Sequence, residues 1–125
     1  MYQTAIVNVS KNCDRSKARF LIKKAVEFLQ DDLPVAIPTE TVYGLAANAL
    51  SSKAVDTIFQ AKRRPSDNPL IVHVSSLEML KTFIKNNEIP PQFLPIIEEF
   101  WPGPLTLLFK KVLNFNTRMI CFLIM

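Results

Sequence analysis

The first half of the chain alternates between helical and extended patterns of apolar residues. Apolar side chains at positions 18, 21, 22, 25, 26 and 29 form one face of a helix, which Asp14 or Ser16 would cap and a proline would end. Similar spacing predicts a second helix over residues 52–63, which another proline stops. Short apolar runs at residues 5–7 and 35–37 predict a first strand and a buried strand.

The second half continues this alternation. Residues 70–74 form a β-branched run that predicts a strand. Ser75, with Glu78 three residues later, forms a capping box that opens a third helix. Two adjacent prolines start a fourth helix that runs to Trp101, and residues 105–109 predict a final strand.

Strands that alternate with helices favour an α/β fold, in which a twisted, open mixed sheet carries packed helices. The length of 125 residues suits one domain over residues 1–125, and a charged fraction of 21% argues against disorder. The longest apolar run, residues 119–125, is far shorter than the roughly 20 residues that span a bilayer. We therefore expect a soluble, cytoplasmic protein that has no membrane partner.

The charge balance is mildly basic, with a net charge of +4 and an isoelectric point near 9.2. This balance permits an anionic ligand or a nucleic acid but requires neither. Cys13 and Cys121 are far apart, and the sequence has no CxxC or Cys/His cluster. With His73 as the single histidine, we expect no metal ligands and no disulfide framework.

The first candidate for chemistry is the segment of residues 38–45, Pro-Thr-Glu-Thr-Val-Tyr-Gly-Leu. It follows the predicted buried strand and precedes a helix, which is where open α/β sheets bind ligands. Thr39, Thr41 and Tyr43 place three hydroxyl groups close together, and Gly44 permits a sharp turn or a close approach to a ligand. The alternative interpretation is a plain strand-to-helix turn with capping threonines.

The second candidate is the segment of residues 62–69, Lys-Arg-Arg-Pro-Ser-Asp-Asn-Pro. Its cations would end a helix, where positive charge is favourable without any ligand. However, two prolines stiffen the loop, and Ser66 and Asn68 add neutral donors beside Lys62 and Arg64. Lysine and arginine commonly bind phosphate, so the segment is a candidate phosphate site or simply a solvated helix end.

Two further positions have both a functional and a structural interpretation. His73 shares one strand face with Ile71, and could reach a cleft or serve only the structure. The turn at residues 101–106 places a glycine between two prolines, and we interpret it as a packing corner anchored by Trp101.

Three blocks, taken together, are more specific than any one of them. They are VAIPTETVYGLAANAL at residues 35–50, IFQAKRRPSDNPLIVHV at 58–74 and FWPGPLTLLFKK at 100–111. In sequence and spacing they resemble the YrdC-like family of threonylcarbamoyl-adenylate synthases, over about residues 18–111. The resemblance implies a twisted α/β sheet around a large basic cavity.

The resemblance also implies an activity. Such enzymes make threonylcarbamoyl-adenylate and pyrophosphate from L-threonine, bicarbonate and ATP, with Mg²⁺ expected beside the nucleotide. The product passes to downstream tRNA threonylcarbamoyl-transferase proteins, which modify adenosine 37 of tRNA. No covalent nucleophile is needed, because positioning and charge stabilisation carry such phosphoryl chemistry.

The family motifs imply roles for individual residues. Lys62 and Arg64 match the Lys-x-Arg signature and would be the catalytic, ATP-binding cations. The resemblance and the loop chemistry together add Ser66 and Asn68 as ATP contacts. The residues expected to orient L-threonine are Thr39, Thr41, Tyr43 and His73.

The match to the family weakens towards one end. The family's later Ser-x-Asn block is not found after Lys111, and the resemblance fades at Val112. We therefore expect residues 112–125 to be a divergent tail produced by truncation or a frameshift, with the C-terminal part of the domain missing.

Three other functions remain open from the sequence. One is a YrdC-like module that binds tRNA or double-stranded RNA, which the positive charge allows. Another is a fragment with no activity of its own. The third is carbamoyl transfer in hydrogenase maturation, although the zinc-finger cysteines of that larger protein have no counterpart here.

Overall fold

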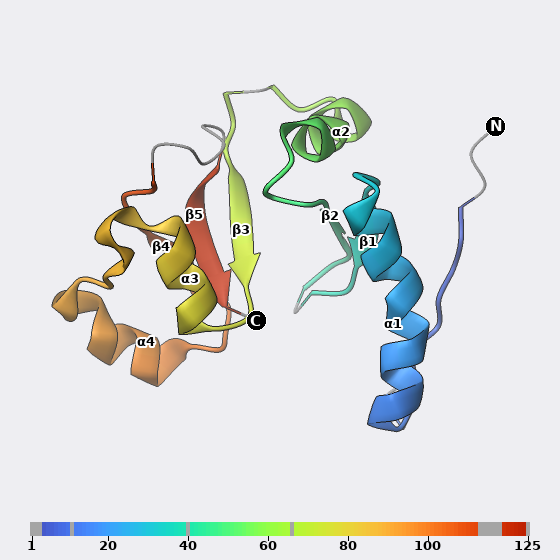
Figure 1. Cartoon of the computed structure of the whole chain (residues 1–125), viewed down its shortest axis with the longest axis horizontal. Helices are drawn as coiled ribbons and strands as arrows, with labels where there is room; N and C mark the ends of the chain where they lie inside the picture. Colours follow the sequence, from blue (N-terminus) through green and yellow to red (C-terminus); the bar gives the residue numbers. More distant parts are fainter. Residues whose placement is uncertain (1–3, 11, 40, 66, 113–118, 125) are drawn as a thin grey trace.

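A computed structural model describes residues 4–10, 12–39, 41–65, 67–112 and 119–124 (Figure 1). Among them, no helix is both long and apolar enough to cross a membrane. The helices are α1 (Arg15–Gln30), α2 (Ser52–Lys62), α3 (Leu77–Phe83) and α4 (Leu94–Phe100), with single 3₁₀ turns at Lys85–Asn87 and Pro91–Phe93. The strands are β1 (Val35–Ile37), β2 (Gly44–Ala46), β3 (Leu70–Val74), β4 (Leu107–Leu108) and β5 (Met119–Ile124).

The strands form two open sheets rather than one. β1 and β2 are an antiparallel pair in which Val35 lies opposite Ala46. β5 lies between β3 and β4, parallel to β3 and antiparallel to β4. This mixed, unclosed arrangement with packed helices confirms the predicted α/β class. Figure 1 shows α1 beyond the β1–β2 pair, on the side away from β3.

Helix α1 begins where the sequence predicted. Asp14 is the N-cap, and its carboxylate accepts a hydrogen bond of 2.9 Å from the backbone amide of Lys17. Ser16 lies inside the helix. The apolar face of α1 is only partly covered, because no residue of α1 is buried.

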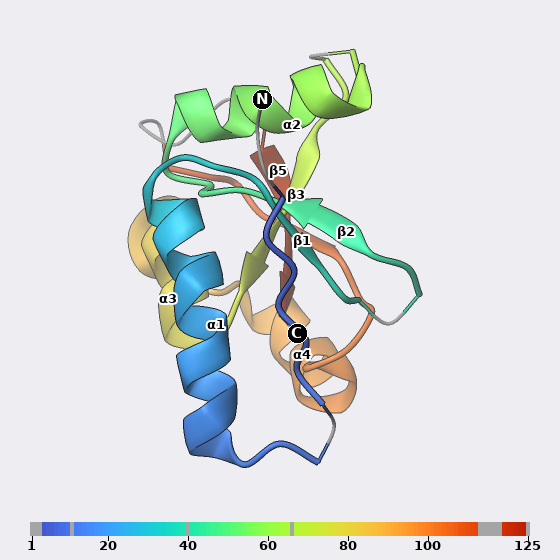
Figure 2. The ribbon, with the colours of Figure 1, turned by 90° about the vertical axis from the view of Figure 1, so that its right-hand side faces the viewer.

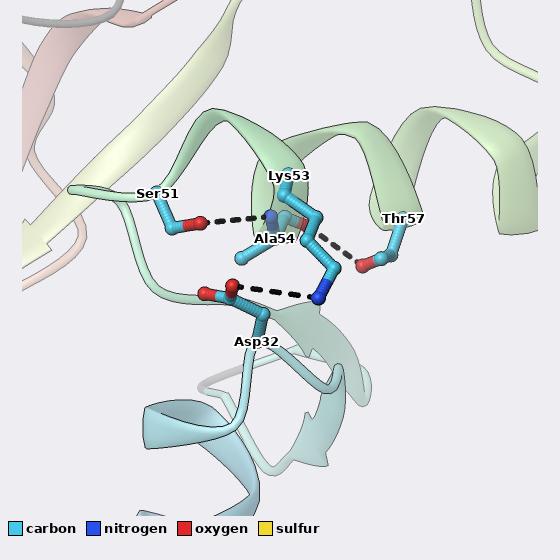
Figure 3. A network of polar contacts seen from close by, with 5 residues as sticks. All are labelled: Asp32, Ser51, Lys53, Ala54 and Thr57. Carbon is cyan, nitrogen blue, oxygen red and sulfur yellow. Dashed lines mark hydrogen bonds and ion pairs between the residues drawn. The ribbon is translucent and has the colours of Figure 1, made fainter.

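A small polar network joins the end of α1 to the start of α2 (Figure 3). Ser51 caps α2 by accepting a hydrogen bond of 3.2 Å from the amide of Ala54. Thr57 donates its hydroxyl to the carbonyl of Ala54 at 2.6 Å. Lys53 lies 3.9 Å from Asp32, a residue in the left-handed region at φ 61°. Because Lys53 is exposed, this ion pair is the weaker part of the network.

The hydrophobic core lies around β3 and is built by α2, α3, α4 and the strand β4. Both Figure 1 and Figure 2 show α2 across one end of β3 and α4 towards the other. The side chains at positions 70, 72 and 74 of β3 are buried, and those at 71 and 73 are exposed. The three buried side chains belong to one cluster with Val55, Ile58, Phe59, Leu80, Phe83, Ile84, Ile97, Trp101, Leu107 and Phe109. Apart from Ala54, every side chain described as buried within residues 4–112 belongs to it.

The turn after α4 is the predicted packing corner. Trp101 is buried, and its indole N–H donates to the carbonyl of Leu105 at 2.6 Å. The amide of Leu105 donates to the carbonyl of Gly103 at 2.8 Å. These bonds fold the segment tightly back on the end of α4.

Four local predictions were wrong. Residues 5–7 form no strand, and β4 covers only two of the residues predicted at 105–109. The last strand is β5, which we did not predict, because its apolar residues show no alternation or turn signal. β1 is not a buried strand: Ala36 is exposed and its neighbours are half-buried, since β1 pairs only with β2.

A further correction concerns the cap of α3. Ser76, not Ser75, is the N-cap, and its hydroxyl accepts a hydrogen bond of 3.1 Å from the amide of Met79. The hydroxyl of Ser75 instead faces the sulfur of Met79 at 3.6 Å. The spacing rule identified the right turn but placed the cap one residue early.

Candidate functional site

The threonine-rich segment is a hairpin loop, not the strand-to-helix turn that we expected. β1 ends at Ile37, the loop reverses the chain, and β2 begins at Gly44 opposite Ile37. The reason is local: residues 44–46 pair along β1 instead of entering a helix. The helix α2 starts later, at Ser52.

The hydroxyl of Thr39 holds this loop together. It donates to the carbonyl of Val42, and it accepts from the amides of Val42 at 3.3 Å and Thr41 at 3.4 Å. A threonine that bonds to backbone two and three residues ahead stabilises a turn without any ligand. Gly44 supports the same arrangement, since a Cβ there would lie 3.3 Å from the methyl carbon of Thr39. Thr39 therefore has a clear structural role in this loop.

The other predicted members of this loop face solvent. Thr41 is exposed, and Tyr43 keeps 77% of its residue surface accessible. Both side chains are therefore free to meet a ligand above the loop.

The Lys-x-Arg segment lies where α2 ends. Lys62 is the last helical residue and is exposed, so its ammonium group complements the negative end of the helix dipole. Arg63 follows in the left-handed region, with φ 49° and ψ 38°. The amide of Arg64 then bonds to the carbonyl of Phe59 at 3.0 Å, which closes the helix in a Schellman-type turn. This turn sends the chain away from the helix axis immediately after Lys62.

Arg64 is fixed by its own loop. Its Nη2 donates to the side-chain oxygen of Asn68 at 2.7 Å and to the carbonyl of Pro69 at 3.3 Å. Asn68 therefore positions Arg64, a role that sequence reasoning missed because it needs the three-dimensional course of the loop. The Nε atom of Arg64 is buried and has no hydrogen-bond partner among the described residues. Ser66, predicted as an ATP contact, lies outside the described residues.

His73 lies on the exposed face of β3, as the strand alternation predicted. It shares this face with Ile71, and its Nδ1 lies 3.2 Å from the Ile71 carbonyl oxygen. The imidazole is accessible to a ligand that approaches the open face of the sheet.

The candidate residues lie in different loops and strands. In Figures 1 and 2 the loop between α2 and β3 lies at the top of the view, and the β1–β2 loop lies below it, near mid-height. Two hollows among the described residues lie elsewhere, one along residues 84–93 and 108–110 and one along α1. The candidate site therefore has two halves in different loops: one of cations, and one of hydroxyl groups.

A metal ion finds no ready site in this arrangement. The described residues contain no group of three His, Cys, Asp or Glu side chains that could hold one.

Comparison with known proteins relates this geometry to a family. The family model Sua5/YciO/YrdC, described as telomere recombination, matches residues 27–121. Over 108 residues the chain is 48% identical to threonylcarbamoyl-AMP synthase of Pyrococcus abyssi, which covers 86% of this chain and 30% of that protein. The Schizosaccharomyces pombe protein of the same name is 45% identical over 115 residues, covering 78% of this chain and 28% of that one.

A solved structure agrees with the sequence matches. The crystal structure of P. abyssi Sua5 complexed with L-threonine superimposes with a TM-score of 0.85 at 40% sequence identity. The superposition covers 97% of this chain and 36% of that protein. The chain thus spans about a third of the length of these relatives.

Proposed function

Because the chain belongs to the Sua5/YciO/YrdC family, we propose that it carries part of the substrate site of a threonylcarbamoyl-AMP synthase. The observation that carries this proposal is the TM-score of 0.85, at 40% identity, to a relative solved with L-threonine. That likeness covers 97% of the chain.

The reaction joins three substrates in two steps. The amino group of L-threonine takes up bicarbonate with loss of water and becomes a carbamate. A carbamate oxygen then attacks the α-phosphorus of ATP, and the bond to pyrophosphate breaks as the new bond to the adenylate forms. Negative charge spreads over the phosphate oxygens during this displacement, so nearby cations lower its barrier.

Lys62 and Arg64 are the cations that we assign to the ATP phosphates. Lys62 is exposed at the end of α2, and the Schellman-type turn places Arg64 in the loop beyond it. The hydrogen bond that Arg64 donates to Asn68 restricts its guanidinium to one orientation, which lowers the entropic cost of holding a phosphate. Ser66 remains a proposed ATP contact.

Thr41, Tyr43 and His73 are the groups that we assign to L-threonine. The two hydroxyl groups and the imidazole are exposed and can exchange hydrogen bonds with the polar groups of an amino acid. We assign Thr39 mainly to the shape of the threonine-binding loop. Its hydroxyl already bonds to the loop backbone, so a contact with L-threonine would have to share that hydroxyl.

We assign no step of the reaction to Mg²⁺, because the described residues contain no group of three His, Cys, Asp or Glu side chains that could hold it. We expect the ion to arrive bound to ATP. The product would serve tRNA threonylcarbamoyl-transferase proteins, and the cytoplasm is the compartment that supplies both ATP and tRNA.

Ligand binding is the sharpest test, because it does not require the whole catalytic cycle. Thermal melting of the purified chain is followed with ATP and with L-threonine at increasing concentrations. A ligand that binds only the folded state at 100 times its Kd stabilises it by about 2.7 kcal/mol. We expect the melting midpoint to rise with each ligand, and the proposal is wrong if it rises with neither.

Substitutions then separate the two halves of the site. Lys62→Ala and Arg64→Ala should abolish the shift caused by ATP and leave that caused by L-threonine. Tyr43→Phe with Thr41→Val should do the reverse. Lys81→Ala, which removes an exposed cation on α3, is the matched control and should respond to both ligands. Equal ATP shifts in all variants would refute the phosphate assignment.

A further inference from the structure

Carbamate formation from L-threonine releases one proton. The amino group of threonine is largely an ammonium ion near neutral pH, and an ammonium nitrogen has no lone pair with which to attack carbon. Threonine and bicarbonate together give the carbamate, one molecule of water and one proton. A site that promotes this step therefore needs a side chain that takes the ammonium proton, and hydroxyl groups and cations do not take it at that pH.

Among the side chains assigned to L-threonine, His73 has the chemistry of a proton acceptor. It is the single histidine of the chain. Imidazole is the side chain that ordinarily gains and loses a proton between pH 5 and 8. Carboxylates are too weak as bases to hold a proton in that range, and lysine and arginine already carry theirs. A base whose range matches the working pH is the most effective one.

The hydrogen bond of the His73 ring determines which of its two nitrogens is free. Nδ1 lies 3.2 Å from the carbonyl oxygen of Ile71, two residues earlier on the same face of β3. A carbonyl oxygen only accepts hydrogen bonds, so Nδ1 carries the hydrogen in this contact. In a neutral imidazole the other nitrogen then has the lone pair. Nε2 of His73 is therefore the proton acceptor.

The strand that carries His73 holds the imidazole in a fixed place. The side chains of Leu70, Val72 and Val74 lie in the hydrophobic core, so the backbone of β3 is anchored on both sides of His73. The carbonyl that orients the ring belongs to the same strand. A catalytic group on a packed strand is positioned more precisely than one on a loop.

The Nε2 atom of His73 is open to a ligand. Among the described residues, none forms a hydrogen bond or an ion pair with it. His73 is exposed, its neighbour Ile71 is 44% exposed, and β3 itself contains no charged residue. A lone pair accepts a hydrogen from an ammonium group and repels a carboxylate, so Nε2 selects the amino end of an amino acid.

We propose that Nε2 of His73 is the base that removes a proton from the ammonium group of L-threonine. An N–H bond of the ammonium breaks as the new bond from hydrogen to Nε2 forms, and the electron pair left on the amine nitrogen attacks the carbon of bicarbonate. One amine hydrogen and the departing hydroxyl group leave as water, which yields the carbamate. The imidazolium then returns its proton to solvent. This inference rests on the proposed function, because it requires L-threonine beside β3.

Nuclear magnetic resonance of the whole chain tests the state of the ring. Because the chain has one histidine, labelling with ¹⁵N-histidine gives the signals of one imidazole. We expect a protonated Nδ1 and an unprotonated Nε2 at a pH of about 8, and a shift of the Nε2 signal when L-threonine is added. The opposite tautomer would overturn the inference. So would an Nε2 signal that ignores L-threonine while the melting midpoint rises with it, which leaves the proposed function intact. If neither responds to L-threonine, both are wrong.

The proton transfer itself is tested without ATP, by following the exchange of ¹³C-bicarbonate into the carbamate of L-threonine. The chain should raise the rate above that of the two solutes alone. His73→Gln keeps a side chain that accepts hydrogen bonds but takes no proton, so it should lose about 100-fold of that gain and keep the melting shift caused by L-threonine. Leu108→Gln places glutamine at an exposed position of β4 in the same sheet, and as the matched control it should keep the full rate.

Chemical rescue separates a lost base from a disturbed structure. Imidazole added to His73→Ala should restore part of the rate, after correction for its effect on the protein-free solution. Pyrazole, a ring of the same size that is a far weaker base, should not. Equal rates for His73→Gln and the unaltered chain would overturn the inference. Equal rescue by both rings would overturn it as well, as would a chain that binds L-threonine and does not raise the rate.

Discussion

The two glycines of the chain allow a direct test of how tightly the corner after α4 is packed. A Cβ built on Gly103 would lie 2.5 Å from the carbonyl oxygen of Phe100, which is 0.5 Å inside the 3.0 Å limit that real Cβ atoms essentially never cross. A Cβ on Gly44 would lie 3.3 Å from a methyl group of Thr39, which is tight but on a side chain. Gly103→Ala should therefore damage the fold, and Gly44→Ala should be tolerated.

The surroundings of each glycine determine how much the two substitutions differ in their effect on stability. The Phe100 carbonyl is backbone, and the bonds of Trp101 to Leu105 and of Leu105 to Gly103 hold the segment around it. Forcing one extra methyl group into such a site costs about 1–3 kcal/mol. Replacing glycine also reduces the freedom of the unfolded chain, which returns about 0.4–1 kcal/mol. The net loss for Gly103→Ala is about 1–2 kcal/mol, and for Gly44→Ala it is near zero.

Urea unfolding followed by circular dichroism measures both variants. With an m value of about 1.5 kcal/mol/M, Gly103→Ala should lower the urea midpoint by about 1 M at an unchanged slope. The Gly44→Ala midpoint should stay within about 0.3 M of the unaltered chain. A Gly103→Ala midpoint at or above that of the unaltered chain would refute the packing argument. So would an equal loss in both variants.

Two further predictions concern helix caps. Ser51→Ala removes the acceptor for the Ala54 amide and should cost about 1 kcal/mol in urea unfolding, whereas Ser52→Ala, one residue later and exposed, should change stability little. A hydrogen bond from its own backbone amide, and then one from the Ser76 hydroxyl, lower the pKa of Glu78 below its ordinary 4.5. That carboxylate therefore stabilises the fold above pH 4.5, and its contribution disappears as the pH falls through the lowered pKa. The unaltered chain should unfold at higher urea than Glu78→Gln at pH 7, and the two midpoints should converge below pH 4.5; a gap that persists at low pH would contradict this.

The parts of the fold that the sequence predicted well are those determined locally. α1 and α2 follow from a 3.6-residue spacing of apolar side chains, and β3 follows from a β-branched run. Asp14 was one of the two predicted N-caps of α1. Such a cap can be predicted because its side chain bonds to a backbone amide only two or three residues ahead. Such features depend on neighbours along the chain and not on what packs against them.

The features that were missed depend on distant partners. β5 pairs with a strand about fifty positions earlier, as Leu70 with Met119 shows, and no local signal announces that pairing. β2 starts at a glycine and spans Gly44–Ala46, residues with little intrinsic strand preference, so only pairing with β1 makes it a strand.

The candidate site shows the same division. The residue types in the two loops could be identified from their chemistry and family resemblance. The relative positions of the two loops could not be predicted, because they depend on how the elements between them pack in three dimensions. The double role of Thr39 and the bond from Arg64 to Asn68 also required the folded loops.

The position of β5 has a consequence for how the chain folds during synthesis. Among the described residues, β3 and β4 each pair with β5 alone, and β5 is translated after both of them. Neither strand can complete its pairing on the ribosome before residues 119–124 emerge, so the helices must form while the three-stranded sheet is still absent. Until then the edge of β3 is open to strands of other nascent chains, and fast release or a chaperone would decide how much of the product reaches the native sheet.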